Sequence, residues 1–161
     1  CMWKYYRSIT ITELTKKAGV GRASFYRNFK DKDDVIIKYF EYQIRIWKDD
    51  LDKQKPSDIN IVESLFIYFK SQEHVLKLLY KDNLSYLMLK SLYNISGPKE
   101  YESNITAYWN ACLVGGLFMW CDEWVKRGMQ ESPKEMANLI AELKNKDIVK
   151  RHPFNQDAFF R

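Results

Sequence analysis

The chain has 161 residues, 46% of them hydrophobic and 16% aromatic, which suits one ordinary domain or a small module fused to a larger one. Six glycines and four prolines are too few for a turn-rich β fold or a disordered chain, and the longest apolar run, residues 111–121, is much shorter than the roughly 20 residues of a membrane span. The net charge of +5 is concentrated at one end, because residues 1–30 alone carry a balance of +6. With no apolar signal segment at the start, we expect a cytoplasmic protein whose N-terminal end attracts a polyanion, although a solvated helix face is the alternative.

The first predicted helix with clear boundaries covers residues 11–18. Thr10 and Glu13 have the spacing of a capping box, in which each side chain bonds the backbone amide of the other residue. Gly19 can take the left-handed conformation that ends a helix. The apolar stripe of this helix predicts that Ile11, Leu14 and Ala18 are buried.

A second, short helix is predicted over residues 22–29 and a long third one from about residue 31 to residue 53. Gly21 stands at the N-cap of the short helix, where it is weaker than serine but acceptable. Asp31 caps the long helix, and two further aspartates in its first turn favour the helix dipole.

The remaining sequence continues as helices separated by recognisable breaks. The segments 55–58 and 96–98 contain proline, and Ser132-Pro133-Lys134-Glu135 forms a second capping box. The helical spacing of apolar residues predicts helices over 59–71, 73–81, 84–95, 99–127 and 133–145. With no alternating strand in the sequence, the fold class is all-α, with about nine helices counting a truncated first one at 2–7.

The short helix 22–29 has the composition of a DNA-reading helix. On a helical wheel Phe25 and Phe29 fall together and face the module core with Leu14 and Val20. The outward set is Arg22, Ala23, Ser24, Tyr26 and Arg27. Arginine can donate to guanine edges, serine can donate or accept, and alanine or a tyrosine ring can contact a thymine methyl group. A plain helical hairpin with exposed charges is the alternative.

Phosphate contacts are expected on both sides of this helix. Lys30 and Lys32 flank the N-terminus of the next helix, whose free amides and dipole suit a phosphate. Thr12 can reach a phosphate on the other side.

The segment Ala18-Gly-Val-Gly-Arg-Ala-Ser-Phe-Tyr-Arg-Asn-Phe-Lys-Asp-Lys32 closely resembles the DNA-binding signature of TetR/AcrR-type transcriptional regulators. That signature is a helix, Ala-Gly-Val, a recognition helix ending in Tyr-x-x-Phe, and a lysine at the next helix. The resemblance covers residues 1 to about 47 by motif and the rest by helix pattern. It implies a DNA-binding domain at 1–47, a regulatory and dimerisation domain at 48–147, and a tail at 148–161.

The resemblance implies that six of the residues named above occupy operator-contacting positions: Thr12, Arg22, Ser24, Tyr26, Lys30 and Lys32. Two departures from the pattern stand out. Gly21 replaces the usual serine, which removes one phosphate contact. The first helix of the family survives only as residues 2–7, so we expect the chain as given to begin inside that helix.

The long helix 99–127 is apolar on all sides around residues 111–121, which in a water-exposed protein predicts burial on both faces. One face packs on its own core and the other on a second subunit, and helix 133–145 supplies a further apolar stripe. A four-helix interface of this kind is also what TetR-like proteins use; a monomer with a thick core is the alternative. The residues assigned to the interface are Val114, Gly115, Phe118, Cys121, Val125, Met136, Leu139, Ile140 and Leu143.

The middle helices would enclose the regulatory pocket that the resemblance implies. For each candidate lining residue, core packing is the favoured interpretation and ligand contact the second. The candidates are Phe66, Phe69, Leu76, Leu79, Tyr80, Tyr86, Met88, Tyr93 and Trp109.

Enzymatic chemistry finds no support in the sequence. His74 and His152 are far apart, neither has a cysteine or carboxylate at metal-ligand spacing, and no glycine-rich phosphate loop follows a strand. We therefore expect no enzyme, no metal and no cofactor. The predicted function is a bacterial, nucleoid-associated repressor that binds a pseudo-palindromic operator as a homodimer and is released by a small apolar or aromatic effector. A regulator that senses another protein, and a helical interaction module with a degenerate DNA face, are the alternatives.

Overall fold

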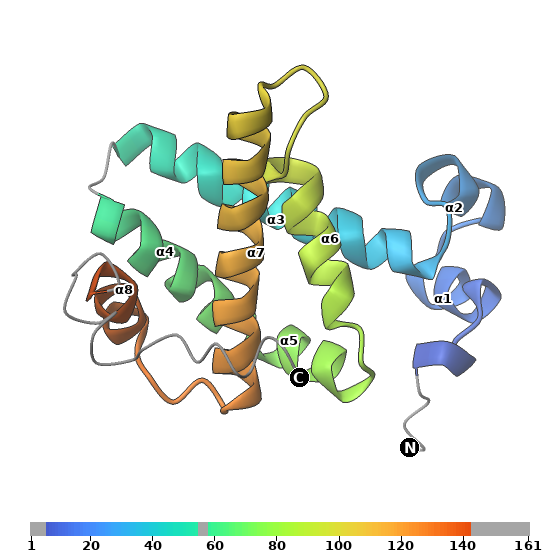
Figure 1. The fold of residues 1–161 in the computed structure, drawn as a ribbon. Coiled ribbons are helices and arrows are strands. Elements are labelled where there is room, and N and C mark those ends of the chain that lie inside the picture. Colours follow the sequence, from blue (N-terminus) through green and yellow to red (C-terminus); the bar gives the residue numbers. More distant parts are fainter. Residues whose placement is uncertain (1–5, 55–57, 143–161) are drawn as a thin grey trace, which may run out of the picture.

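The computed structural model of the chain describes residues 6–54 and 58–142, and every regular element in them is helical (Figure 1). The all-α prediction is therefore confirmed for this part of the chain. The elements are a short 3-10 helix η1 (Tyr6–Ser8) and the α-helices α1 (Ile11–Ala18), α2 (Arg22–Asn28), α3 (Lys32–Gln54), α4 (Asp58–Ser71), α5 (Glu73–Lys81), α6 (Ser85–Ser96), α7 (Asn104–Lys126) and α8 (Pro133–Glu142).

Both ends of α1 form as the sequence predicts. The Thr10 hydroxyl accepts from the Glu13 amide, and the Glu13 carboxylate accepts from the Thr10 amide at 2.9 Å. Gly19 ends the helix with a left-handed φ of 68°, which allows the Val20 amide to donate to the Thr15 carbonyl at 3.0 Å. The buried stripe differs from the prediction: Ala18 is exposed and Thr15 is buried, its hydroxyl bonded to carbonyls of the preceding turn.

The second capping box also forms and starts α8. The Glu135 carboxylate accepts from the Ser132 amide at 2.7 Å, and the Ser132 hydroxyl accepts from the Glu135 amide at 3.3 Å. This short contact lowers the pKa of Glu135, since the amide hydrogen bond favours its ionised form. The predictions for Leu143, for the helix end at 145 and for the tail 148–161 lie outside the described residues.

The start of α7 differs from the prediction of residue 99. Residues 98–103 form a loop, in which the Glu102 carboxylate accepts from the Lys99 amide at 3.0 Å. The Ser103 hydroxyl then accepts from the Thr106 amide and caps the helix. Local capping after the proline thus places the start five residues later than the apolar pattern indicates.

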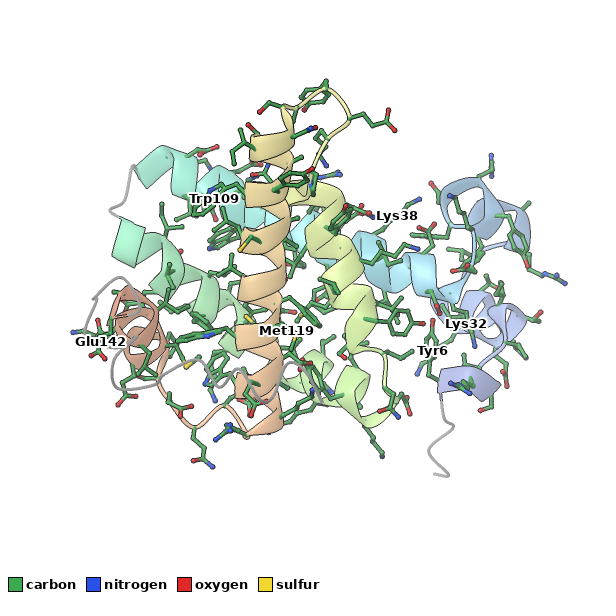
Figure 2. All side chains as sticks on the ribbon, in the orientation of Figure 1. Tyr6, Lys32, Lys38, Trp109, Met119 and Glu142 are labelled. Carbon is green, nitrogen blue, oxygen red and sulfur yellow. The ribbon has the colours of Figure 1, made fainter. Side chains whose placement is uncertain are left out.

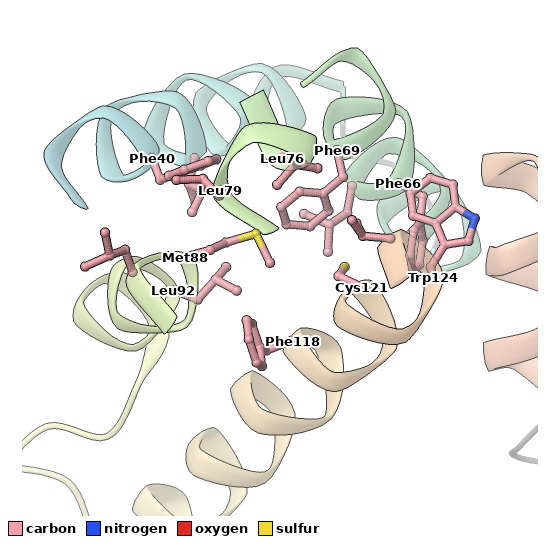
Figure 3. Close-up of a cluster of buried hydrophobic side chains, with 14 of the residues drawn as sticks. Phe40, Phe66, Phe69, Leu76, Leu79, Met88, Leu92, Phe118, Cys121 and Trp124 are labelled. Atoms are coloured by element: carbon pink, nitrogen blue, oxygen red, sulfur yellow. The ribbon is translucent and has the colours of Figure 1, made fainter. Parts of the chain in front are cut away.

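The core lies where α7 crosses the middle helices, and α3 packs against α6 while α4 packs against α8 (Figures 1 and 3). Phe66 of α4 is fully buried and meets the Trp124 ring edge to face, with 5.2 Å between ring centroids. The largest fully buried side chains are Phe40, Phe66, Phe69, Ile44, Leu76, Leu87 and Met88, with Cys121 and Ser91.

The face of α7 that the sequence assigned to a partner subunit lies instead in this core, so that assignment is wrong. Figure 3 shows Phe118 and Cys121 pointing toward the side chains of the middle helices. The interface residues buried within the protomer are Val114, Phe118, Cys121, Val125 and Met136. Ile140 packs partly on the core, Gly115 is half-buried, and Leu139 alone of the described set is an exposed hydrophobic side chain. Of the two free cysteines in the described residues, Cys121 is buried and Cys112 is exposed.

Helix α3 connects the two ends of the molecule without a break. Its first turns carry α1 and α2, and its later turns pass into the core behind α6 and α7 (Figure 1). The predicted domain boundary between residues 47 and 48 therefore falls inside a continuous helix and not in a linker.

Candidate nucleic-acid interface

The inner side of the short helix α2 is aromatic, as the helical wheel predicts. Phe25 is buried and lies 5.5 Å from Phe29, measured between ring centroids. The Tyr26 ring stands edge-on to Phe25 at 5.4 Å and remains half exposed. Val20, predicted to face the module core, is 49% exposed, because it belongs to the turn whose backbone closes α1.

The outer side of α2 carries the expected polar and basic groups. Arg22, Ala23 and Arg27 are exposed, and Ser24 is half-buried. The Arg27 guanidinium donates from Nη2 to the Ser24 hydroxyl at 3.1 Å, so the two side chains lie on one face. This face presents hydrogen-bond donors, a hydroxyl group and a tyrosine ring, the groups that read base edges in a major groove.

Of the three predicted phosphate contacts, Thr12 and Lys30 are exposed, but Lys32 has other partners. Its ammonium group donates to the carbonyls of Tyr6, Arg7 and Ile9 at 2.9, 3.3 and 2.8 Å. A lysine has three donor protons, so these bonds use its full capacity. In this structure Lys32 therefore fixes the segment before α1 and is not available for a phosphate.

Lys38 also belongs to this module, although no sequence motif singles it out. Its ammonium group donates to the Asn28 carbonyl at the end of α2 and lies 3.3 Å from the Asp34 carboxylate. It also lies 5.3 Å from the centre of the Phe29 ring. Because a cation stabilises a helix C-terminus, Lys38 holds the end of α2 against α3. No short motif predicts this contact, since the bonded residues are ten positions apart.

The candidate pocket residues do not meet in one place. Five of them, Phe66, Phe69, Leu76, Leu79 and Met88, are buried core residues. Tyr86, Tyr93 and Trp109 are exposed. Tyr80 is half-buried at the edge of an open pocket of about 510 Å³, and its hydroxyl donates to the buried Asp122 carboxylate at 2.8 Å. Burial and this bond raise the pKa of Tyr80 well above its ordinary value.

The exposed face of α7 is apolar along most of its length. Figure 2 labels Trp109 and Met119, two of the side chains on this helix that are more than half exposed. Gly116 is also exposed, and a Cβ atom there would meet no atom within 4 Å. The exposed hydrophobic side chains of α7 are Ile105, Tyr108, Trp109, Leu113 and Met119.

Residues 6–54 and 58–142 contain neither a metal site nor a membrane-spanning helix. In these ranges no group of three or more His, Cys, Asp or Glu side chains could hold a metal ion. Within the same residues, no helix has the length and apolar character needed to cross a membrane.

Residues 6–39, which include η1, α1, α2 and the first turns of α3, match the family model described as bacterial regulatory proteins, tetR family. No curated protein and no solved structure matches the chain. The matched segment contains the capped α1, the glycine turn, the outward face of α2 and the lysines around them. Residues 6–39 therefore form a helix-turn-helix domain of the TetR type, which supports a DNA-binding transcriptional regulator.

Proposed function

We propose that the protein is a repressor that binds a pseudo-palindromic operator as a homodimer and is released by a small effector. The main support for a dimer is the apolar face of α7, which includes Trp109, Leu113 and Met119 and is exposed to solvent in the protomer. Such a face is unfavourable in water and typical of a protein interface. A short recognition helix also gains most when a second copy reads the other half-site.

The proposed dimer uses the exposed face of α7, opposite the buried face that the sequence had indicated for the partner. Gly116 allows close approach of a second α7, because nothing in the protomer occupies the space beside it. Leu139 of α8 is exposed as well, so we include α8 in the proposed interface, which would then contain α7 and α8 of both protomers. The isologous contact of a two-fold dimer needs a self-complementary patch, which an apolar helix face provides.

For the effector, the proposed site is the open pocket beside Tyr80. It is lined by Lys77, Tyr80, Asn83, Ser85, Val125 and Lys126. A tyrosine ring and a valine suit an aromatic ligand, and the lysines and the amide suit a polar group on it. Of the candidate lining residues, Tyr80 borders this pocket, whereas Phe66 and Phe69 fill the core.

Operator binding is tested by titrating duplexes selected from a random pool at several salt concentrations. Because each neutralised phosphate releases counterions, log Kobs is expected to fall linearly with log salt by about 0.9 per phosphate. Selected sequences are expected to contain two related half-sites. Binding weaker than about 10⁻⁴ M at low salt, where even non-specific binding is tighter, would contradict a DNA-binding function.

Arg27→Ala is expected to weaken binding to the selected operator by about 1–3 kcal/mol and to relax the base preference at one position, because the guanidinium lies on the outer face of α2. The matched control is Arg127→Ala, which removes the same charge from an exposed position after α7. Competition with single-base variants of the operator gives the measurement. An equal loss on every sequence would show that Arg27 contacts only phosphate.

A further inference from the structure

Tyr6 lies where the helix-turn-helix module meets the regulatory helices, and it makes three kinds of contact there. Its hydroxyl donates to Asp33 Oδ1 at 2.7 Å, and its amide donates to Asp82 Oδ2 at 3.3 Å. Its ring lies 4.6 Å from the Lys32 ammonium group (Figure 2). Burial, with Asp33 nearby, raises the pKa of Tyr6 far above its ordinary value, so the hydroxyl remains a donor at physiological pH.

Asp33 extends this connection to the regulatory helices. Its second carboxylate oxygen accepts from the Tyr86 hydroxyl of α6 at 2.9 Å. The Asp33 carboxylate at the start of α3 thus accepts one hydrogen bond from Tyr6 and another from Tyr86 of α6. Hydrogen bonds to an ionised group are stronger than neutral ones and fix direction as well as distance.

Apart from α3 itself and Tyr6, which packs partly on the core, the module makes few contacts with the regulatory helices. Helices α1 and α2 pack chiefly on one another, whereas α3 packs on α6 and α4 packs on α8. The polar bonds of Tyr6, Asp33, Asp82 and Tyr86 therefore add to the packing of α3 on α6 in holding the module at one angle.

We propose that Tyr6, Asp33 and Tyr86 are positioning residues for operator binding, because they fix the orientation of the recognition helix relative to the regulatory helices. They lie away from the outer face of α2 and do not take part in base reading. In a dimer, the angle of each module sets the distance between the two recognition helices. Their effect should consequently appear on a complete operator and not on an isolated half-site.

The turn between α5 and α6 connects this junction with the pocket proposed for the effector. Asn83 has a left-handed φ of 57° and lines that pocket and also the two open pockets beside Tyr6. The preceding residue, Asp82, accepts from Tyr6. A ligand beside Tyr80 would contact the turn that bonds the module, a step that rests on the proposed function.

The test compares Tyr86→Phe with Tyr93→Phe. Both tyrosines lie on α6 and are 50% and 49% exposed, but only Tyr86 donates to Asp33. Each variant is titrated with a complete selected operator and with a duplex that contains one half-site. Tyr86→Phe is expected to bind the complete operator about 2- to 10-fold more weakly than Tyr93→Phe, the change that one net hydrogen bond gives, and to bind the half-site equally well.

Hydrogen exchange of the free protein provides a second readout that needs no DNA. In the double variant Tyr86→Phe with Asp82→Ala, amides of residues 10–30 are expected to exchange about 5- to 100-fold faster than in Tyr93→Phe, since two hydrogen bonds to the regulatory helices are lost. The proposal would be overturned if Tyr86→Phe weakened binding to the operator and to the half-site equally. It would also be overturned if the affinity for the operator and the exchange rates were both unchanged. If the unmodified protein binds operator and half-site equally, the dimeric function fails instead, and the exchange measurement alone decides on the junction.

Discussion

Leu113→Glu is expected to convert the proposed dimer to a monomer of 19.3 kDa at micromolar concentration. Leu113 is 44% exposed in the protomer, so the glutamate remains hydrated in a monomer and leaves the fold intact. In the proposed dimer the same carboxylate would be buried against an apolar partner without a compensating charge, which is strongly unfavourable. Sedimentation equilibrium gives the mass directly.

In the proposed dimer two linked modules would bind an operator with avidity, so the functional consequence of this substitution is expected to be large. Losing the link is expected to weaken binding to the complete operator by about 10²- to 10⁴-fold, while binding to a single half-site is unchanged. The matched control is Ile67→Glu, since Ile67 is an apolar side chain of α4 with 54% exposure. If Ile67→Glu were monomeric and Leu113→Glu dimeric, the interface would lie on α4 instead of α7. If the unmodified protein were monomeric, the proposed dimer would be excluded.

Phe66→Ala is expected to lower the free energy of unfolding by about 3–5 kcal/mol, because it opens a cavity beside Trp124 in the core. A loss of this size is a large part of the roughly 5–15 kcal/mol that holds an ordinary domain together. Urea unfolding followed by tryptophan fluorescence gives the measurement. The neighbouring Ile67→Ala is the control and is expected to change stability by no more than about 0.5 kcal/mol.

The same experiment separates two roles for Phe66. A core residue loses both its transfer energy and its contacts when truncated, whereas a residue lining a hydrated ligand pocket loses little. A loss below about 1 kcal/mol would therefore favour the pocket interpretation and would reopen the question of where an effector binds.

The features that the sequence predicted correctly are helix ends and helix faces, which depend on residues close together in the chain. The capping boxes at Thr10 and Ser132 and the glycine end of α1 need only residues within six positions of one another. The aromatic inner face of α2 follows from a spacing of four residues. Interactions of this range are encoded in short segments, so they can be read before the fold is known.

The errors concern features that only tertiary packing decides. Around residues 111–121 the sequence of α7 is apolar in every direction, so its periodicity contains no information about which face turns inward. Lys32 has the position of a phosphate contact, but its carbonyl partners lie 23 to 26 residues away. The bonds of Tyr6 reach Asp33 and Asp82 across 27 and 76 positions, beyond any motif.

The unbroken course of α3 has a mechanical consequence. A helix of 23 residues is roughly 34 Å long, so a tilt of about 5° at its inner end moves its outer end by about 3 Å. This is close to the rise of about 3.4 Å between successive base pairs. In a symmetric dimer the same tilt would occur in both protomers. A small rotation of α3 within the core would then shift both α2 helices away from the spacing of one turn of DNA.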